Sequence, residues 1–222
     1  HTGRAGCGRL YRGECGEEMT GVIWIVLGYF AGSLPTGYLA ALWVKGVDIR
    51  TVGSGGTGAT NVGRLLGQRW AKAVAVIDMV KGAVPMLCAM AFGQGDPWVL
   101  ALTGFAGVVG HDYPIWLSFR GGKGVATSYG VAFFLHPWVS FIIAPAAGLV
   151  WLGVLKAKGY VSLASLVSLW CLPLFALALS FPLAHIVVLG ALAALATLRH
   201  RENIKRLLEG KESRFGKHAT NR

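Results

Sequence analysis

Long apolar stretches alternate with short polar or basic segments along the chain. The apolar stretches cover residues 19–44, about 73–92, about 98–118, 125–155 and 160–198. A helix that crosses the hydrocarbon of a bilayer needs about 20 mostly apolar residues. The last two stretches are interrupted at His136–Pro137 and at 180–182, so each accommodates two helices. The pattern therefore predicts an all-α, polytopic integral membrane protein with seven transmembrane helices.

The basic residues predict the orientation of these helices. With seven spans, 17 of the 21 Lys and Arg residues fall on one side, whereas the opposite loops near 93–97, 136–137 and 180–182 contain none. Cytoplasmic loops carry the excess of Lys and Arg. We therefore expect the N-terminus outside and the C-terminus in the cytoplasm. A single span over 125–155 would place Lys156 and Lys158 on the wrong side, which favours two.

Composition agrees with a membrane protein and excludes several other classes. Of 222 residues, 54% are apolar and only 14% are charged, although the net charge is +11. Globular proteins carry about 25% charged residues. The chain is therefore too apolar for a soluble domain, a disordered segment or a nucleic-acid-binding protein, and membrane lipids are its expected surroundings. The 32 glycines, many of them inside the apolar stretches, suit close helix packing in lipid.

The two ends differ from the central region. Residues 1–18 mix charges, Gly and Cys without the apolar run that a signal peptide requires, and Met19 opens the first span. We therefore interpret Met19 as the natural start and expect 1–18 to be a disordered extension. Residues 19–212 are predicted to form a single domain, followed by a basic cytoplasmic tail over 213–222. The cysteines show no CxxC spacing, so neither a metal nor a redox site is predicted.

The first polar cluster is a glycine-rich segment between the first two spans. Glycines at 53, 55, 56 and 58 allow successive backbone N–H groups to converge on an anion. The candidate donors around them are Arg50, Gly53, Ser54, Gly55, Thr60, Asn61 and Arg64. A flexible linker is the ordinary alternative, but it does not require two arginines, hydroxyls and an Asn at this density. Oxyanion binding is the favoured interpretation.

The second cluster runs from Gly110-His111 to Thr127 and contains Gly121-Gly122-Lys123-Gly124. Open backbone, one ammonium group and a following helix form a typical phosphate cradle. Gly124 stands where a nucleotide-binding P-loop has Ser or Thr, so ATP hydrolysis is disfavoured. A positively charged turn that sets topology would explain Lys123 but not the flanking glycines. His111 fits an interfacial histidine and a substrate contact equally well.

The third cluster, Arg199 to Glu212, predicts an interfacial helix that ends at Gly210. His200 and Asn203 are three residues apart and therefore share one face of that helix. In the second span Asp78 and Lys81 have the same spacing, which fits a structural ion pair as well as a catalytic role. Pro35, with Ser33 and Gly37, predicts a kink in the first span.

Together these motifs resemble one protein family. Gly32 to Gly37, Gly53 to Asn61, Gly110 to Thr127 and His200 to Glu212 are similar, in the same order, to the bacterial acyl-phosphate:glycerol-3-phosphate acyltransferases. The resemblance implies an inner-membrane enzyme that moves an acyl chain from acyl phosphate to sn-glycerol 3-phosphate. The products would be lysophosphatidic acid and phosphate, in the first acylation of phospholipid biosynthesis. Coenzyme A, acyl carrier protein and any other cofactor would be unnecessary. One departure is Gly56, where the family usually has Asn.

The resemblance also implies roles for individual residues. Ser54, Lys123, His200 and Asn203 correspond to the family's catalytic residues. Lys123, Arg64, His200 and Asn203 would hold glycerol 3-phosphate, while Ser54, Thr60, nearby backbone N–H groups and Ser162 would hold acyl phosphate. The other expected binding residues are Arg50, Gly53, Gly55, Asn61, His111, Gly121, Gly122 and Gly124.

The expected mechanism needs no covalent acyl-enzyme. The chain contains no His-x-x-x-x-Asp motif and no evident Ser-His-Asp arrangement. Acyl phosphate is already activated, so positioning and charge stabilisation suffice. The glycerol hydroxyl would attack directly and lose its proton to a substrate phosphate oxygen or to His200. A transporter of small phosphorylated anions and a non-catalytic lipid-binding protein are the alternatives. All three polar clusters are expected on one face of the membrane, which argues against the transporter. A monomer is compatible with the expected enzyme.

Overall fold

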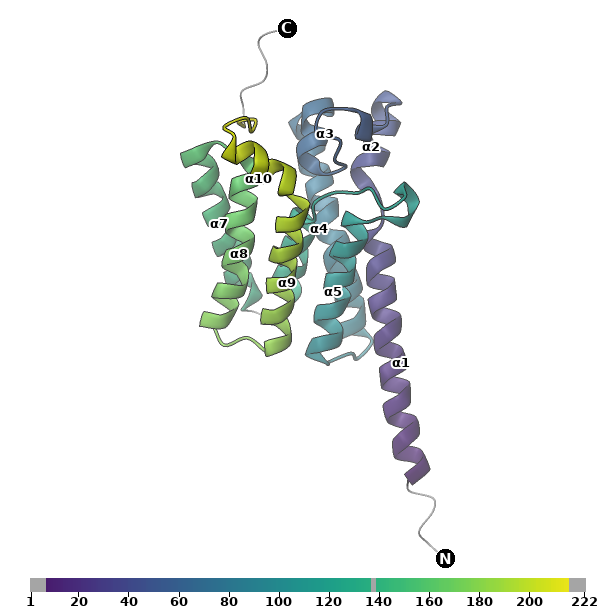
Figure 1. The fold of residues 1–222 in the computed structure, drawn as a ribbon. Helices are drawn as coiled ribbons and strands as arrows, with labels where there is room; N and C mark the ends of the chain where they lie inside the picture. The colour runs from purple at the N-terminus through teal and green to yellow at the C-terminus, as the bar shows by residue number, and fades with distance from the viewer. Residues whose placement is uncertain (1–6, 137–138, 216–222) are drawn as a thin grey trace, which may run out of the picture.

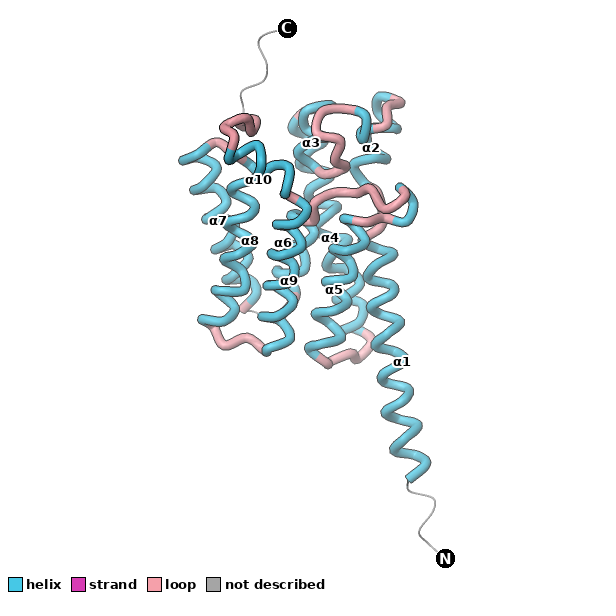
Figure 2. Tube along the Cα trace, in the orientation of Figure 1, coloured by secondary structure: helices cyan, strands magenta, loops and turns pink. Residues whose placement is uncertain are grey.

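The structure is a computed structural model that describes residues 7–136 and 139–215, with side chains from Met19 onward in these ranges. Within them the regular structure is entirely helical (Figures 1 and 2). The α-helices are α1 (Cys7–Gly32), α2 (Thr36–Lys45), α3 (Ala59–Leu66), α4 (Gln68–Ala91), α5 (Pro97–Asp112), α6 (Val125–Phe134), α7 (Ser140–Lys158), α8 (Val161–Ala178), α9 (Leu183–Arg199) and α10 (Arg201–Leu208). Two short 3₁₀ turns, η1 (Ile49–Thr51) and η2 (Ile115–Leu117), interrupt the loops. The expected all-α class is confirmed.

The first span is broken in the predicted place. α1 ends at Gly32 and α2 begins at Thr36, with Pro35 between them. Proline has no N–H to donate to the preceding turn, so it interrupts a helix. Residues 7–18 were expected to be disordered, but they form the first turns of α1. Extending an existing helix is far easier than nucleating one, and the apolar helix that follows supplies the nucleus.

The two long apolar stretches each divide into two helices, as predicted. α6 ends at Phe134 and α7 begins at Ser140, while α8 and α9 are separated by residues 179–182. Pro137, expected at the first break, lies outside the described residues. The third stretch is shorter than expected, because α5 ends at Asp112 rather than near 118. Tyr113 precedes Pro114, and a residue before proline disfavours the helical conformation.

Fewer spans than seven meet a strict length and hydropathy criterion. In the described part of the chain, Met19–Lys45, Gln68–Ala91, Ser140–Lys158 and Val161–Ala178 are long and apolar enough to cross a bilayer. α9 with α10, bent by 62°, makes a fifth candidate if the pair is one span. α5 has 16 residues and α6 only 10. The seven segments are all helical, but the number that crosses the membrane stays a prediction.

Glycines allow the helices to approach at backbone distance. A Cβ on Gly32 would collide with the carbonyl group of Gly107, so α1 and α5 touch at their backbones. A Cβ on Gly82 would lie 2.7 Å from the carbonyl oxygen of Thr127, where α4 meets α6. Close packing through small residues is the usual way in which helices associate in lipid. These contacts bring polar groups of α4 and α5 close to each other and to the loops.

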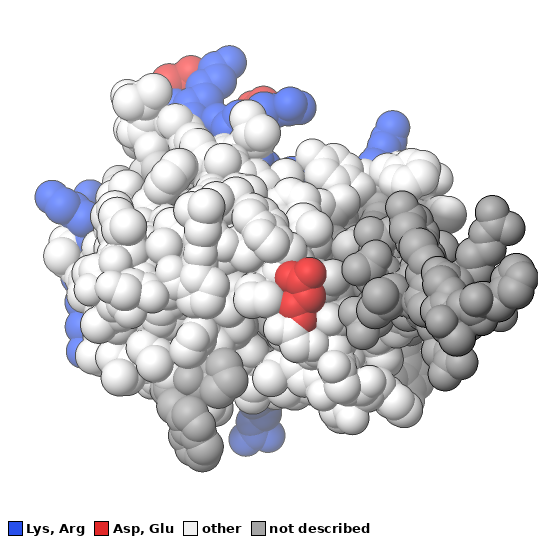
Figure 3. Space-filling view, turned by 90° about the horizontal axis from the view of Figure 1, so that it is seen from below, with Lys and Arg blue, Asp and Glu red and all other residues white. Residues whose placement is uncertain are grey.

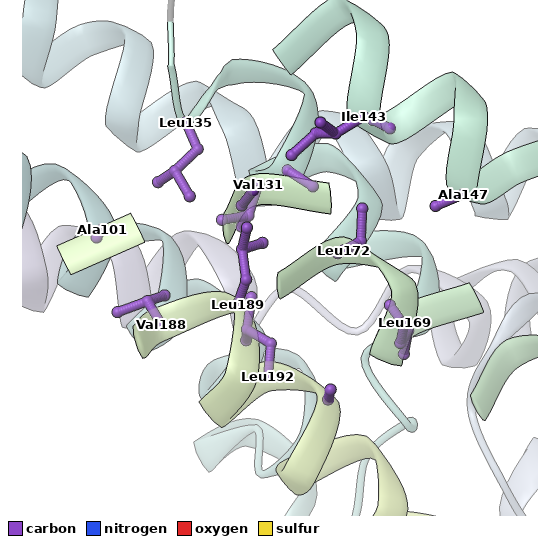
Figure 4. Close-up of a cluster of buried hydrophobic side chains, with 14 of the residues drawn as sticks. Ala101, Val131, Leu135, Ile143, Ala147, Leu169, Leu172, Val188, Leu189 and Leu192 are labelled. Carbon is purple, nitrogen blue, oxygen red and sulfur yellow. The ribbon is translucent and has the colours of Figure 1, made fainter. Parts of the chain in front are cut away.

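The apolar core lies among α5 to α9 (Figure 4). Val131, Leu172 and Leu189, from three different helices, are almost fully buried at its centre. A second, smaller core lies beneath α2 and α3, around Ile49 and Val62. The larger core holds α9, and with it α10, in place. The smaller core supports the glycine-rich segment.

The two ends of the bundle differ in chemistry. α2, α3, α10 and the segment 113–124 lie towards one end, where the C-terminal part of the described chain also lies (Figure 1). The described part of the other end, seen from below in Figure 3, is almost entirely uncharged, and Lys and Arg side chains are seen only around its outline. All three polar clusters therefore lie at one end, as the sequence predicts. We call this the polar end.

Candidate active site

The Gly53–Asn61 loop is organised by one side chain. The Asn61 amide nitrogen donates to the carbonyl oxygens of Ile49, Val52 and Gly56 at 2.9–3.2 Å, and its oxygen accepts from the Ser54 N–H at 3.1 Å. Asn61 is 2% exposed. Gly53 has φ +61°, and a Cβ there would collide with the Asn61 oxygen. Asn61 thus shapes the loop from inside, which favours a positioning role over the expected substrate contact.

The donors that this loop presents are Ser54 and Thr60, both exposed. Among the described residues, no hydrogen bond or ion pair joins either of them to Lys123 or to its partners. Gly55 also has a positive φ, +70°, and its N–H donates to Val52 in the turn. The loop therefore offers hydroxyl groups at the surface of the polar end, as an anion-binding loop requires.

Arg50 links the first cluster to the second. Its guanidinium forms a two-point pair with Asp48, 2.7 Å at the shortest, and donates to the Leu117 carbonyl at 3.3 Å. The Arg50 hydrogen bonds hold the pKa of Asp48 below its usual value, although burial acts in the opposite direction. Arg50 also lies over the Tyr38 ring, 5.3 Å from its centroid. Its expected role in substrate binding must therefore compete with these internal contacts.

The Lys123 loop, residues 119–124, folds back onto the end of α5. The Gly122 and Gly121 N–H groups donate to the carbonyls of His111 and Asp112 at 3.1 and 3.2 Å. A Cβ on Gly122 would overlap the His111 ring, so any other residue there would force that ring to move. Gly124 has φ +65° and precedes the first residue of α6. The predicted order of glycine loop, lysine and helix start is confirmed.

Arg199 fastens this loop to the end of α9. Its guanidinium donates to the Gly122 carbonyl at 2.8 and 3.1 Å and lies 4.7 Å from the centroid of the Tyr113 ring. Asp112, which is fully buried, lies 4.0 Å from the same guanidinium. Arg199 stood in the third motif without an assigned role. Its contacts show that it joins the second and third clusters.

Lys123 itself belongs to a polar network that we call the Lys123 network, made of Lys123, Ser162, Asn203, Arg206 and Glu212. The Lys123 ammonium donates to the Asn203 side-chain oxygen. Glu212 accepts from Asn203 at 2.7 Å, from Ser162 at 2.8 Å and from Arg206 at 2.7 Å. One carboxylate therefore orients three donors, and through Asn203 it orients Lys123.

Burial and neighbouring charges tune the ionisable groups of the network. Burial, reinforced by Arg206, lowers the pKa of Lys123 to about 8. For Glu212, burial raises the pKa, but hydrogen bonds from Asn203, Arg206 and Ser162 outweigh it and lower the pKa below its usual value. The site thus holds an ammonium group whose pKa lies near neutral pH, beside a carboxylate that is ionised at that pH. An anionic ligand would keep Lys123 protonated.

His200 is a neutral imidazole at physiological pH. Burial, with a contribution from Lys123, lowers its pKa to about 4. Nδ1 lies 2.7 Å from the Ala196 carbonyl oxygen, which can only accept, so Nδ1 carries the proton. Nε2 is then the acceptor nitrogen. This assignment favours His200 as a hydrogen-bond acceptor for a hydroxyl group over a cationic ligand of phosphate.

The structure brings only part of the expected site into direct contact. Lys123, Asn203 and Ser162 meet through Glu212, while Arg64 donates to Ser213 at 3.0 Å and adds positive charge near Lys123. The expected site residues did not include Glu212, Arg199 or Arg206. Glu212 is one of three glutamates, with Glu202 and Glu209, in the basic segment after the last span, so the charge pattern alone did not single it out. Among the described residues, no group of three or more His, Cys, Asp or Glu side chains is arranged to hold a metal ion.

These features define a class: an integral membrane protein with a candidate anion-binding site at the polar end of a helical bundle. The profile of the family described as glycerol-3-phosphate acyltransferase matches residues 22–210. The chain therefore belongs to the glycerol-3-phosphate acyltransferase family, whose members are membrane enzymes of phospholipid biosynthesis. The family resemblance found in the sequence is confirmed.

Relatives and solved structures cover nearly the whole chain. Glycerol-3-phosphate acyltransferases from Aquifex aeolicus and Desulforudis audaxviator are 43% and 46% identical, over 89% and 87% of this chain and 100% and 95% of theirs. A crystal structure of PlsY (YgiH), an integral membrane glycerol 3-phosphate acyltransferase in its glycerol 3-phosphate form, matches with a TM-score of 0.82 and 43% identity. That match covers 88% of this chain and 96% of the other. The lysophosphatidic acid form of PlsY matches with a TM-score of 0.80 and 42% identity.

Proposed function

We propose that this enzyme takes its acyl group from acyl phosphate and releases 1-acyl-glycerol 3-phosphate, which is lysophosphatidic acid, and inorganic phosphate. The observation that carries the proposal is the Lys123 network, which aims an ammonium group from a glycine loop beside further arginines. The acceptor is then a phosphate monoester and the donor an acyl phosphate. Both carry a phosphate group that positively charged donors bind. The PlsY structures, in glycerol 3-phosphate and lysophosphatidic acid forms, support the acceptor and the product.

Glycerol 3-phosphate is assigned to the Lys123 side of the site. Lys123 and Arg64 supply charge to its phosphate, and the Asn203 amide fixes the Lys123 ammonium. Charge-assisted hydrogen bonds to phosphate are about twice as strong as neutral ones. His200, neutral and accepting through Nε2, suits the glycerol hydroxyl group better than the phosphate.

Acyl phosphate is assigned to the Gly53–Asn61 loop. Ser54 and Thr60 are exposed there, and the loop backbone is held open by Asn61. Ser162 was expected to share this role, but its hydroxyl proton is directed to Glu212 at 2.8 Å. This contact therefore favours a role for Ser162 in orienting Glu212 over a role in binding acyl phosphate. The donors that remain for acyl phosphate come from the loop itself.

The chemical step needs no acyl-enzyme. The glycerol hydroxyl oxygen forms a bond to the acyl carbon, the bond from that carbon to the phosphate oxygen breaks, and phosphate leaves. A phosphate monoester has a second pKa of about 6. His200, with a pKa of about 4, is a weaker base than that. The hydroxyl proton therefore passes to a substrate phosphate oxygen, while His200 orients the hydroxyl group.

The proposed location is the bacterial inner membrane, with the polar end in the cytoplasm. The excess of Lys and Arg at that end supports this orientation. Glycerol 3-phosphate is water-soluble, so the site must face the compartment that contains it. Labelling of single cysteines placed at each end, in intact cells and in lysed cells, would test the orientation.

One assay tests the proposed reaction. Purified protein is incubated with palmitoyl phosphate and labelled glycerol 3-phosphate, and labelled lysophosphatidic acid is measured. We expect Lys123→Ala and Ser54→Ala to lower the rate by about 100-fold or more. Thr103→Val is the control, since Thr103 is buried in α5 and its hydroxyl group donates only to the Val99 carbonyl.

Three outcomes would contradict the proposal. Product formation from acyl-coenzyme A but not from palmitoyl phosphate would overturn the donor. A stable acylated protein formed from acyl phosphate alone would overturn direct attack. Uptake of glycerol 3-phosphate into proteoliposomes without acyl transfer would favour the transporter.

A further inference from the structure

Four polar residues meet between α2, α4 and α5, away from the Lys123 network. We call Thr36, Asp78, Lys81 and His111 the Asp78 cluster. The Asp78 carboxylate accepts from the Thr36 hydroxyl at 2.5 Å, pairs with the Lys81 ammonium at 2.9 Å and lies 3.5 Å from the His111 Nδ1. Asp78 is 1% exposed and Lys81 and His111 are each 7% exposed. A buried ionisable group in a membrane segment is costly and usually serves function.

One arm of the cluster reaches the break between α1 and α2. Lys81 donates to the Leu34 carbonyl at 2.7 Å, and Thr36, bonded to Asp78, is the first residue of α2. Pro35 interrupts the helix here, so this backbone cannot be held by the usual ladder of helical hydrogen bonds. α2 leads through η1 into the Gly53–Asn61 loop. Asp78 and Lys81 therefore fix the root of the loop assigned to acyl phosphate.

The other arm reaches the loop that carries Lys123. His111 lies beside Asp78, and its ring fills the space under Gly122 so closely that a Cβ on that glycine would overlap it. The His111 carbonyl accepts from the Gly122 N–H at 3.1 Å. Any tilt of the His111 ring or of the end of α5 would therefore move Gly122 and the Lys123 next to it.

We propose that Asp78 is a positioning residue for acyl transfer, because it ties the roots of the Gly53–Asn61 loop and the Lys123 loop to one helix, α4. The spacing between the two phosphate-binding loops is then set by a carboxylate that touches neither substrate. This inference rests on the proposed function, which assigns one substrate to each loop. It also gives Asp78 and Lys81 a role that an isolated structural ion pair would not have.

The central experiment asks whether Asp78 acts through Lys123. Asp78→Asn is made in the natural sequence and in Lys123→Ala, and kcat and KM for glycerol 3-phosphate are measured at saturating palmitoyl phosphate, so that the effect of the α2 arm on palmitoyl phosphate binding does not enter. In the natural sequence we expect a loss of about 10- to 100-fold in kcat/KM, as misplacement by about 1 Å produces. In Lys123→Ala we expect the residual rate to change by less than about twofold, since residues that act as a unit are not additive.

The outcomes separate the two hypotheses. Equal losses in both backgrounds, or natural kinetics for Asp78→Asn, would overturn the positioning role and leave the proposed function intact. A fully active Lys123→Ala would instead overturn the assignment of Lys123. If Asp78→Asn alone fails to fold, Asp78→Asn with Lys81→Met removes both charges together and serves in its place. Recovery of natural kinetics by that double variant would show a structural ion pair and overturn the proposal.

A matched pair of threonine variants tests the arm at α2. Thr36→Val removes the hydrogen bond to Asp78, whereas Thr103→Val removes one within α5. We expect Thr36→Val to raise the KM for palmitoyl phosphate several-fold and to leave the midpoint of thermal unfolding close to that of Thr103→Val. Identical kinetics in the two variants would overturn this arm of the proposal.

Discussion

The Gly53–Asn61 loop is held by one side chain, whereas the Lys123 loop is held from several sides. Asn61 makes four hydrogen bonds inside the first loop and leaves Ser54 and Thr60 exposed. The second loop is bonded to the end of α5, to Arg199 and, through Lys123, to Asn203. A preorganised cation suits a small, soluble phosphate. A more open set of hydroxyl donors suits a phosphate that arrives attached to a lipid chain.

Asn61→Ala should have the largest effect, because it removes the side chain that organises the inside of the first loop. Asn61 is buried, and its loss leaves the carbonyls of Ile49, Val52 and Gly56 without their donor. We expect kcat/KM for palmitoyl phosphate to fall by about 100-fold, while KM for glycerol 3-phosphate changes little. Steady-state assays with each substrate varied in turn check this. An equal effect on both substrates would mean that the loops are not separate.

Glu212→Gln should have a smaller effect, on the opposite substrate. The variant keeps the shape of Glu212 but loses the charge that accepts from Ser162, Asn203 and Arg206. Hydrogen bonds to charged groups contribute about 1.5–3 kcal/mol each, and a neutral amide oxygen retains part of that. We expect KM for glycerol 3-phosphate to rise about tenfold. Glu209→Gln is the matched control, since Glu209 forms its ion pair, among the described residues, with exposed Lys211.

The pH dependence of glycerol 3-phosphate binding should report Lys123. The pKa of Lys123 is lowered to about 8, so its ammonium is present below that pH and is lost as the pH rises through it. The substrate phosphate becomes a dianion above a pKa of about 6. KM should therefore be lowest between these values and rise several-fold over the pH unit above the Lys123 pKa. In Lys123→Arg the alkaline rise should vanish, because guanidinium stays protonated; an unchanged rise would assign it to another group.

Gly56→Asn should have the smallest effect. The resemblance found in the sequence implies Asn where this chain has Gly56. A Cβ at this position would meet only the Ser54 hydroxyl, at 3.8 Å, so a larger side chain fits. The Gly56 carbonyl, which accepts from Asn61, is unaffected by the side chain. We expect kcat/KM for both substrates to stay within about twofold of the natural value. A larger change would reveal a polar contact that this chain lacks.

Local sequence patterns predicted the helices and the loops, but not the contacts between them. Pro35 predicts the break in the first span, and the glycines around Lys123 predict the turn before α6, because both effects act within a few residues. The contact between Asp78 and His111 joins residues that are 33 positions apart on different helices. Glu212 and Ser162 are 50 positions apart. Neither contact produces a periodic pattern of residues that a single sequence would reveal.

The length of helix α5 shows a second limit of reading local patterns. The apolar residues Ile115, Trp116 and Leu117 extend the third stretch towards 118, but Pro114 ends the helix and these residues form η2. Ile115 and Trp116 are exposed. Apolar character alone therefore does not distinguish a membrane span from an exposed surface turn.

Under the proposed function, the shortness of α6 sets the depth at which the two substrates meet. Ten helical residues rise about 15 Å, half of a hydrocarbon core about 30 Å thick. Lys123, just before the start of this helix, belongs to the loop 113–124, which lies below α3 in Figure 2, and its ammonium contacts Asn203 of α10. An acyl chain could stay among its neighbouring lipids while its carbonyl group reaches the site. Glycerol 3-phosphate would enter the site from the water, while the acyl phosphate would stay in the bilayer.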